Sequence, residues 1–270
     1  MHTRHYDNLA FGSMLAASGN ASASVIAHAP AAHRAMVSKL RPGGPMVRVA
    51  GGHALARRGG RVTDESTNWS GYAATGGNGA FTSVSASWTQ PTATCAGRGR
   101  QELFSSFWAG LDGFSSGSVE QTGTDSDCVG RTPDYFGWFE MFPAAPVNFP
   151  NTVRPGDKMT ASVTFSGTET YTLVLKDTTE GWTQTVTKNQ AGLARSSAEV
   201  ITEAPSSNSG VLPLADFGTV SYSATSANGA SLGTQSPTEI IMIDNSGAQK
   251  DSTSAINSAG GFSNAWIRSN

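Results

Sequence analysis

Hydrophobic and polar positions alternate in short runs over most of the chain, and Gly, Asn, Asp, Ser and Pro residues separate the runs. Between Met159 and Phe165, every second residue is apolar and the residues between them are Thr or Ser. This period of two is typical of a β-strand with one buried and one solvated face. Helical periodicity is almost absent. We predict strands at residues 68–75, 81–90, 104–112, 118–125, 135–142, 158–166, 171–177, 182–188, 196–204, 217–226, 238–244 and 262–268.

The number of predicted strands indicates two packed sheets rather than one. Open sheets of about a dozen twisted strands tend to split into two layers that bury a shared core. The clean alternation within several strands also favours antiparallel pairing, with one face buried and the other wet. The sequence therefore predicts an all-β fold, an antiparallel β-sandwich.

The composition changes near residue 64, where we place a boundary between two parts. Residues 1–63 hold eight basic residues and one acidic residue, a net charge of +7, whereas residues 64–270 hold ten basic and nineteen acidic residues, a net charge of −9. We expect residues 1–63 to be a signal-like and basic pro-segment, largely disordered, and residues 64–270 to be the folded domain. An acidic domain argues against nucleic-acid binding.

The start of the chain has features of a secretion signal. Arg4 precedes a weakly apolar run at residues 9–17, and small residues at 21–23 or 28–30 offer a processing region. No run reaches the roughly 20 apolar residues that span a bilayer, so we predict an exported, extracellular protein without a membrane anchor. Charge attraction between Arg57, Arg58 and Arg61 and the acidic domain suggests an inhibitory pro-segment, as in a zymogen.

The distribution of histidine restricts the chemistry. All five histidines lie between His2 and His53, so the domain from residue 64 onward has none. This excludes Ser-His-Asp and Cys-His catalysis there and argues against a typical zinc site. We predict no metal and no cofactor. Carboxylates, amides and hydroxyls remain, and carboxyl groups exchange protons most readily in acidic surroundings.

The chain has two cysteines, Cys95 and Cys128, 33 positions apart. This spacing matches no CxxC metal or redox motif. We predict a disulfide, which over a loop of this size contributes roughly 3–4 kcal/mol. Two free buried thiols are the alternative, and the prediction depends on an oxidising compartment.

Polar and aromatic side chains share one phase along four predicted strands. The pairs and triplets two or four residues apart are Trp108 and Asp112; Gln121 and Asp125; Trp138, Glu140 and Phe142; and Glu199, Ile201 and Glu203. If these strands are neighbours in one curved sheet, they form an acidic groove with aromatic walls that fits an extended polymer. Taken singly, each carboxylate could equally form a turn or face solvent. The common phase favours a site.

Five motifs then carry a specific resemblance. They are Asn68-Trp-Ser-Gly-Tyr72, Phe107-Trp-Ala-Gly-Leu-Asp-Gly113, Val119-Glu-Gln-Thr-Gly123, Trp138-Phe-Glu-Met-Phe-Pro143 and Ser197-Ala-Glu-Val-Ile-Thr-Glu203. In this order they resemble the glutamic peptidases, or eqolisins, which are secreted acid endopeptidases. The resemblance implies a sandwich of two large curved sheets, a concanavalin-like or lectin-like jelly roll. It also implies a polypeptide substrate and a catalytic Gln–Glu dyad.

The resemblance assigns the dyad to Gln121 and Glu203. Glu203 would accept a proton from the attacking water and return one to the leaving amine, while the Gln121 amide would stabilise the oxyanion. The remaining candidates, which would line the groove or support the dyad, are Trp69, Trp108, Asp112, Asp125, Trp138, Glu140 and Phe142. For Trp69 and Phe142, core packing is an equal alternative.

Three points stay open in the sequence. Glu199 shares a face with Glu203 and competes for the catalytic role, and Val200 stands where the family commonly has an aromatic residue. A glycoside hydrolase, with Glu140 and Glu203 as its carboxyl pair, or a carbohydrate-binding module would also use an aromatic β-sandwich groove. No exposed apolar stripe indicates a subunit interface, so we expect a monomer.

Overall fold

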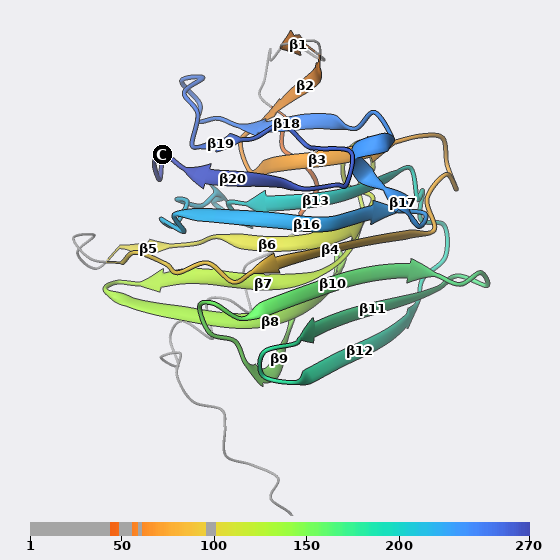
Figure 1. Ribbon diagram of the computed structural model, residues 1–270, viewed down its shortest axis with the longest axis horizontal. Helices are drawn as coiled ribbons and strands as arrows, with labels where there is room; N and C mark the ends of the chain where they lie inside the picture. The colour runs from red at the N-terminus through yellow and green to blue at the C-terminus, as the bar shows by residue number, and fades with distance from the viewer. Residues whose placement is uncertain (1–43, 49–55, 59–60, 96–100) are drawn as a thin grey trace, which may run out of the picture.

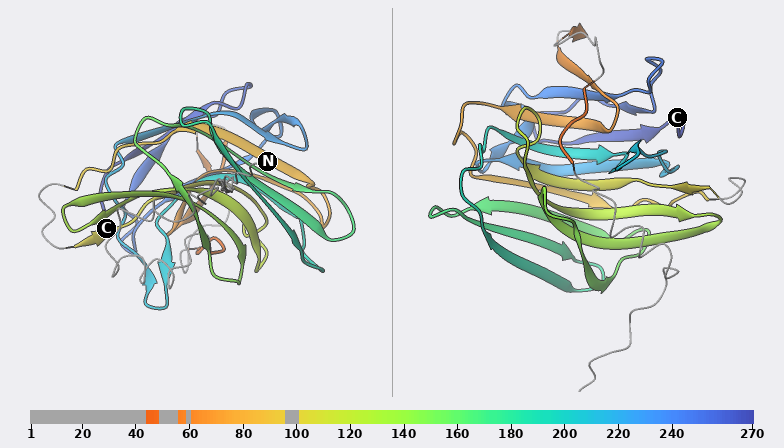
Figure 2. Two further views of the ribbon diagram at one scale, coloured as in Figure 1. Left: turned by 90° about the horizontal axis from the view of Figure 1, so that it is seen from below. Right: turned by 180° about the vertical axis from the view of Figure 1, so that it is seen from behind.

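The computed structural model describes residues 44–48, 56–58, 61–95 and 101–270 of the chain. These residues form two large β-sheets stacked face to face (Figures 1 and 2). The prediction of an all-β sandwich is therefore confirmed. The single helix among the described residues is one 3-10 turn, η1 (Leu232–Thr234). Nothing helical in the described ranges has the length and apolar character needed to cross a membrane.

The larger sheet has ten strands and carries the predicted site. In spatial order they are β1 (Ala56–Arg58), β2 (Arg61–Ser66), β18 (Thr238–Met242), β3 (Trp69–Thr75), β13 (Ser197–Glu203), β6 (Ser106–Leu111), β7 (Val119–Val129), β8 (Thr132–Phe142) and β9 (Val147–Thr152), with β5 (Glu102–Leu103) paired to β7. The pairings are antiparallel, except that β18 runs parallel to β2.

The second sheet has eight strands and covers one face of the first. In spatial order they are β12 (Trp182–Asn189), β11 (Thr170–Asp177), β10 (Lys158–Phe165), β4 (Ser83–Thr89), β16 (Thr219–Ala227), β20 (Phe262–Trp266) and β19 (Asp251–Thr253), with β17 (Ala230–Ser231) paired to β16. A separate small hairpin joins β14 (Ser206–Ser207) to β15 (Gly210–Val211).

The main hydrophobic core lies between the two sheets. Phe107 of β6 and Val200 of β13 point into it from the larger sheet and are fully buried, and Leu173 of β11 meets them from the second sheet. Because side chains alternate along a strand, Trp108 and Ile201 must point to the opposite face of the larger sheet. That face has its own apolar cluster.

All twelve predicted strands are present, but the pattern missed several others. The predicted strands leave out β9, which contains Pro150; β9 is the last strand of the sheet order, where a missing backbone donor is tolerated. Strand β2 is rich in charged residues and spans residues 61–66, so the predicted boundary between residues 63 and 64 falls inside it. The predictions for residues 1–43 lie outside the described residues.

The predicted disulfide between Cys95 and Cys128 is confirmed. The two Cα atoms are 5.4 Å apart, and both side chains are buried. Cys128 lies on β7 opposite Leu103 of β5, and Ala93 and Ala215 complete a small cluster around the bridge. The disulfide therefore ties the residues that follow β4 to the far end of β7.

Candidate active site

Five neighbouring strands of the larger sheet, β3, β13, β6, β7 and β8, carry the predicted site residues. Glu203 of β13 pairs with Trp69 of β3, and Gln121 of β7 pairs with Glu140 of β8. Directly paired residues point to the same side, so the common phase predicted from the sequence continues across all five strands. We call this surface the site face: the side of the larger sheet, turned away from the main core, that carries Trp69, Trp108, Gln121, Trp138, Glu140 and Glu203.

The carboxyl group of Glu203 is held by two side-chain donors. Trp108 Nε1 donates to Oε2 over 2.9 Å, and Asn68 Nδ2 donates to Oε1 over 3.2 Å. Glu203 is fully buried. Burial raises its pKa well above the usual range; the Trp108 hydrogen bond opposes that shift and the nearby Glu140 charge adds to it. The site therefore favours a protonated Glu203 while keeping donors in place for its ionised form.

Gln121 is held by Glu140 on the neighbouring strand. Its Nε2 donates to Glu140 Oε2 over 2.9 Å, and both residues are fully buried. Gly110 pairs with Gln121 on the other side, and a Cβ at this position would lie 3.0 Å from Gln121 Cβ and 2.9 Å from Trp108 Cζ3. The glycine thus leaves room for Gln121 and Trp108 to lie side by side.

The aromatic side chains of the site face form a cluster. Trp69 and Trp108 meet edge to face, with ring centroids 4.9 Å apart. Trp138 belongs to the same cluster, and Phe142 packs against it while partly buried. The structure thus places Trp69 and Phe142 with the site-face cluster rather than in the core between the sheets.

The two predicted supporting aspartates have different surroundings. Asp125 accepts a hydrogen bond from Trp138 Nε1 over 2.6 Å, so it positions an aromatic residue of the site face. Asp112 follows β6 with a φ of 69° and accepts hydrogen bonds from the backbone N–H groups of Arg195 and Ser196. Its visible role is to fix the segment that enters β13, at a distance from Glu203 along the sheet.

Glu199 is the alternative to Glu203 as the catalytic carboxyl group. It lies on β13, two positions before Ile201, and is fully buried. It shares the face of Gln121, because both residues pair with Gly110. Ser197 Oγ donates to it over 3.4 Å. Burial, and then the charge of Asp112, raises its pKa well above the usual range. The Trp108 and Asn68 donors contact Glu203 instead.

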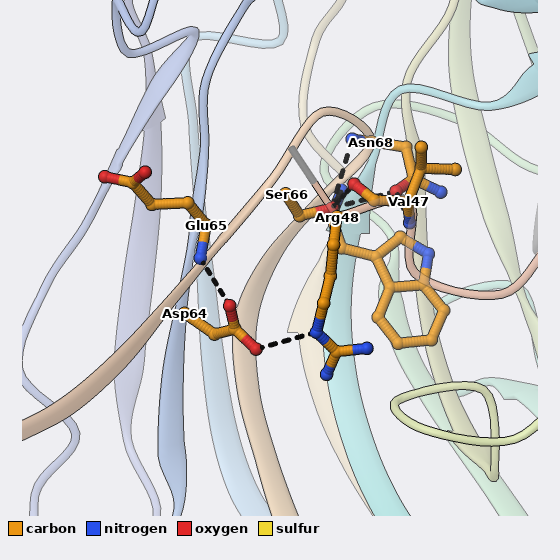
Figure 3. A network of polar contacts seen from close by, with 7 residues as sticks. Val47, Arg48, Asp64, Glu65, Ser66 and Asn68 are labelled. Carbon is orange, nitrogen blue, oxygen red and sulfur yellow. Dashed lines mark hydrogen bonds and ion pairs between the residues drawn. The ribbon is translucent and has the colours of Figure 1, made fainter. Parts of the chain in front are cut away.

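Sequence reasoning gave Asn68 no role, although it opens one of the five motifs. Asn68 precedes β3 and is fully buried, and Ser66 Oγ donates to its Oδ1 over 2.9 Å (Figure 3). The signal was present, because a buried Asn next to a strand of apolar residues needs polar partners. Its partner Glu203 is 135 positions away, so the sequence could not identify it.

The arrangement supplies a proton-exchanging carboxyl group and an amide donor on one face. Neither group depends on an imidazole, since no histidine occurs after residue 53. Together with a sandwich of two large antiparallel sheets, these features define the class of glutamic peptidases, which are hydrolases of peptide bonds.

The chain belongs to the peptidase A4 family, the glutamic peptidases or eqolisins, whose family model matches residues 67–263. Aspergillopepsin-2 of Aspergillus niger is 27% identical over 201 residues, which cover 66% of this chain and 70% of that protein. The described fold also resembles scytalido-glutamic peptidase solved with a transition state analog inhibitor, with a TM-score of 0.63 and 25% identity over 74% of this chain and 98% of that one. Aspergilloglutamic peptidase from Aspergillus niger shares the fold, with a TM-score of 0.54 and 22% identity over 61% of this chain and 99% of that one.

Proposed function

We propose that this glutamic peptidase is an acid endopeptidase in which Glu203 and Gln121 form the catalytic dyad. The observation that carries the proposal is the pair of donors on Glu203, because Trp108 and Asn68 hold each carboxyl oxygen in a defined place. A general acid or base needs such orientation to reach the reacting atoms.

The dyad supports hydrolysis without a covalent intermediate. Ionised Glu203 takes a proton from water as the water oxygen bonds to the peptide carbonyl carbon, and the carbonyl oxygen gains the negative charge. The Gln121 amide donates a hydrogen bond to that oxyanion, an interaction often worth about 3–4 kcal/mol in the transition state. The C–N bond then breaks as Glu203 returns the proton to the leaving amine.

An acidic working range agrees with the electrostatics of the buried carboxyl groups. Burial raises the pKa of Glu120 to about 9, so the folded state that positions Glu203 loses stability as the pH rises above about 4.5. The domain has no histidine, so it lacks an imidazole base that would work near neutral pH. We infer that activity falls as the pH rises towards neutrality.

The alternatives of a glycoside hydrolase and a carbohydrate-binding module are disfavoured. A glycosidase uses two carboxyl groups on either side of the scissile bond. Here the Glu140 carboxyl group contacts an amide, Gln121, across 2.9 Å. The family match points to peptide substrates in addition.

Hydrolysis of a denatured protein at about pH 3–4 tests the proposal. The wild-type chain should release peptides, and Gln121→Ala should lower kcat about 10²–10³-fold, as expected for a lost oxyanion donor. Gln101→Ala is the matched control, because Gln101 is exposed. Release of sugars instead of peptides, or equal kcat in the two variants, would overturn the assignment.

We also propose that the enzyme acts in an oxidising compartment outside the cell. The buried Cys95–Cys128 disulfide supports this, since such bonds persist mainly in exported proteins. Immunodetection of the protein in the culture medium of its own cells checks the proposal, and recovery only from the cell lysate, with both thiols free, contradicts it.

A further inference from the structure

A short segment before β2 lies across the site face. Residues 44–48 are drawn in orange-red in Figure 2, and Figure 3 shows Val47 and Arg48 in close-up. Met46 N donates to Gly113 O over 3.0 Å, and Val47 O accepts the N–H of Thr67 over 2.9 Å. The segment is therefore bound through its backbone on both sides, in the way that an extended peptide is bound.

Met46 inserts its side chain into the apolar cluster of the site face. Its exposed fraction is 7%, and the cluster around it includes Trp69, Trp108 and Ile201. Val47, the next residue, is 42% exposed. The Met46 side chain is buried and the Val47 side chain faces outward. An extended peptide ligand binds in the same way, because every second side chain enters a pocket.

Asn68 links the segment to the catalytic carboxyl group. Its Nδ2 donates to Pro45 O over 3.3 Å and to Glu203 Oε1 over 3.2 Å, and its Oδ1 accepts the Val47 N–H over 2.7 Å. The backbone carbonyl of Pro45 thus shares a donor with Glu203. The peptide backbone at Pro45 therefore lies close to the carboxyl group that exchanges protons in the proposed mechanism.

Two further contacts, both made by Arg48, hold the end of the segment. Arg48 Nε donates to Asp64 Oδ2 over 3.1 Å, and the Arg48 guanidinium lies 4.8 Å above the centroid of the Phe114 ring (Figure 3 shows the ion pair). The sequence suggested that Arg57, Arg58 and Arg61 hold the pro-segment on the acidic domain by charge attraction. The side chains of these arginines lie outside the described part of the structure. The described attachment uses Met46, Asn68 and Arg48.

We propose that residues 44–48 are a tethered ligand of the substrate-binding face, in which Met46 fills an apolar subsite beside Glu203. This inference rests on the proposed function. A peptide substrate with an unbranched apolar side chain competes with Met46 for the subsite. A segment docked for nine-tenths of the time would raise the apparent KM about tenfold without changing kcat, because only the open fraction binds substrate.

The test compares Met46→Ser with Val47→Ser in the full chain. KM and kcat are measured at initial rate on a fluorogenic peptide taken from the cleavage products of a denatured protein, and mass spectrometry verifies that residues 44–48 are still attached. Met46→Ser should lower KM at least fivefold and leave kcat unchanged, whereas Val47→Ser should match the wild type. Equal KM in Met46→Ser and the wild type, or an equal fall in both variants, would overturn the inference.

Hydrogen exchange of the peptide that contains residues 44–48 separates this inference from the proposed function. Met46→Ser should speed its exchange and Val47→Ser should not, whether or not the chain cleaves peptides. If neither variant nor wild type is a peptidase but this difference remains, the proposed function fails and the docking stands. If exchange is equally fast in all three proteins, the docking itself is refuted.

Discussion

At the scale of single residues, the Glu203 carboxyl group depends on the donors around it. Asn68 and Trp108 each donate to one of its oxygens. Both hydrogen bonds favour the ionised form and lower the pKa of Glu203 against the effect of burial. The two donors therefore adjust the pH at which the proposed base becomes available.

Asn68→Ala tests this adjustment. Removing the donor should raise the pKa of Glu203, so the acidic limb of the pH profile of kcat/KM should move to higher pH. Asn245→Ala, at an exposed turn position, is the control. An unchanged limb in Asn68→Ala, with kcat reduced at every pH, would leave Asn68 a purely structural role.

At the scale of elements, the site requires close contact between β6 and β7. A Cβ at Gly123 would lie 2.2 Å from Phe107 O and 2.5 Å from Trp108 Cβ, so the strands could not keep their spacing. Gly123→Ala should lower the free energy of unfolding by about 1–3 kcal/mol and displace Trp108 from Glu203. Gly117→Ala is the control, because nothing lies within 4 Å of a Cβ there. Equal unfolding midpoints in urea for the two variants would contradict the packing argument.

The sequence predicted which side chains share a face of a strand better than it predicted which strands pair with each other. The period of two placed Trp108, Gln121 and Glu203 in one phase, because alternation is a local property of each strand. The pairing of β13 with both β3 and β6 depends on contacts about a hundred positions apart, which alternation does not encode. For the same reason the role of Asp112 at the entry to β13 was not visible in the sequence.

Short, polar or proline-containing elements were the hardest to predict. Strand β2 has a charged sequence, and it becomes a strand because β18 pairs with it in parallel. The segment 44–48 has no strand pattern and is held by tertiary contacts, with Asn68 and Gly113 among its partners. Tertiary pairing, rather than local propensity, decides such segments.

At the scale of the whole molecule, buried carboxyl groups should make the protein most stable in acid. Burial, and then the charge of Asp112, raises the pKa of Glu120 from 4.5 to about 9. The unfolded chain ionises near the lower value, so folding stability is fully present below about pH 4.5 and falls as the pH rises towards 9. Burial shifts the pKa of Asp251 in the same direction, to about 7.

Glu120→Gln should flatten this dependence. One such group contributes a slope of up to about 1.4 kcal/mol per pH unit, so the variant should lose less stability than the wild type between pH 5 and pH 8. Thermal unfolding midpoints across that range measure the effect. Glu169→Gln, at an exposed position, should follow the wild type. A variant with the same slope as the wild type would show that Glu120 does not carry the dependence.

The central proposal is that Glu203, rather than its neighbour Glu199 on the same strand and face, exchanges protons with the peptide. The most direct measurement is kcat for Glu203→Gln and Glu199→Gln on one peptide substrate at about pH 4, with folding of both variants verified by thermal unfolding. We expect Glu203→Gln to lose activity about 10²–10⁴-fold and Glu199→Gln to stay within about tenfold of the wild type. The reverse order would contradict the proposal and move the catalytic role to Glu199.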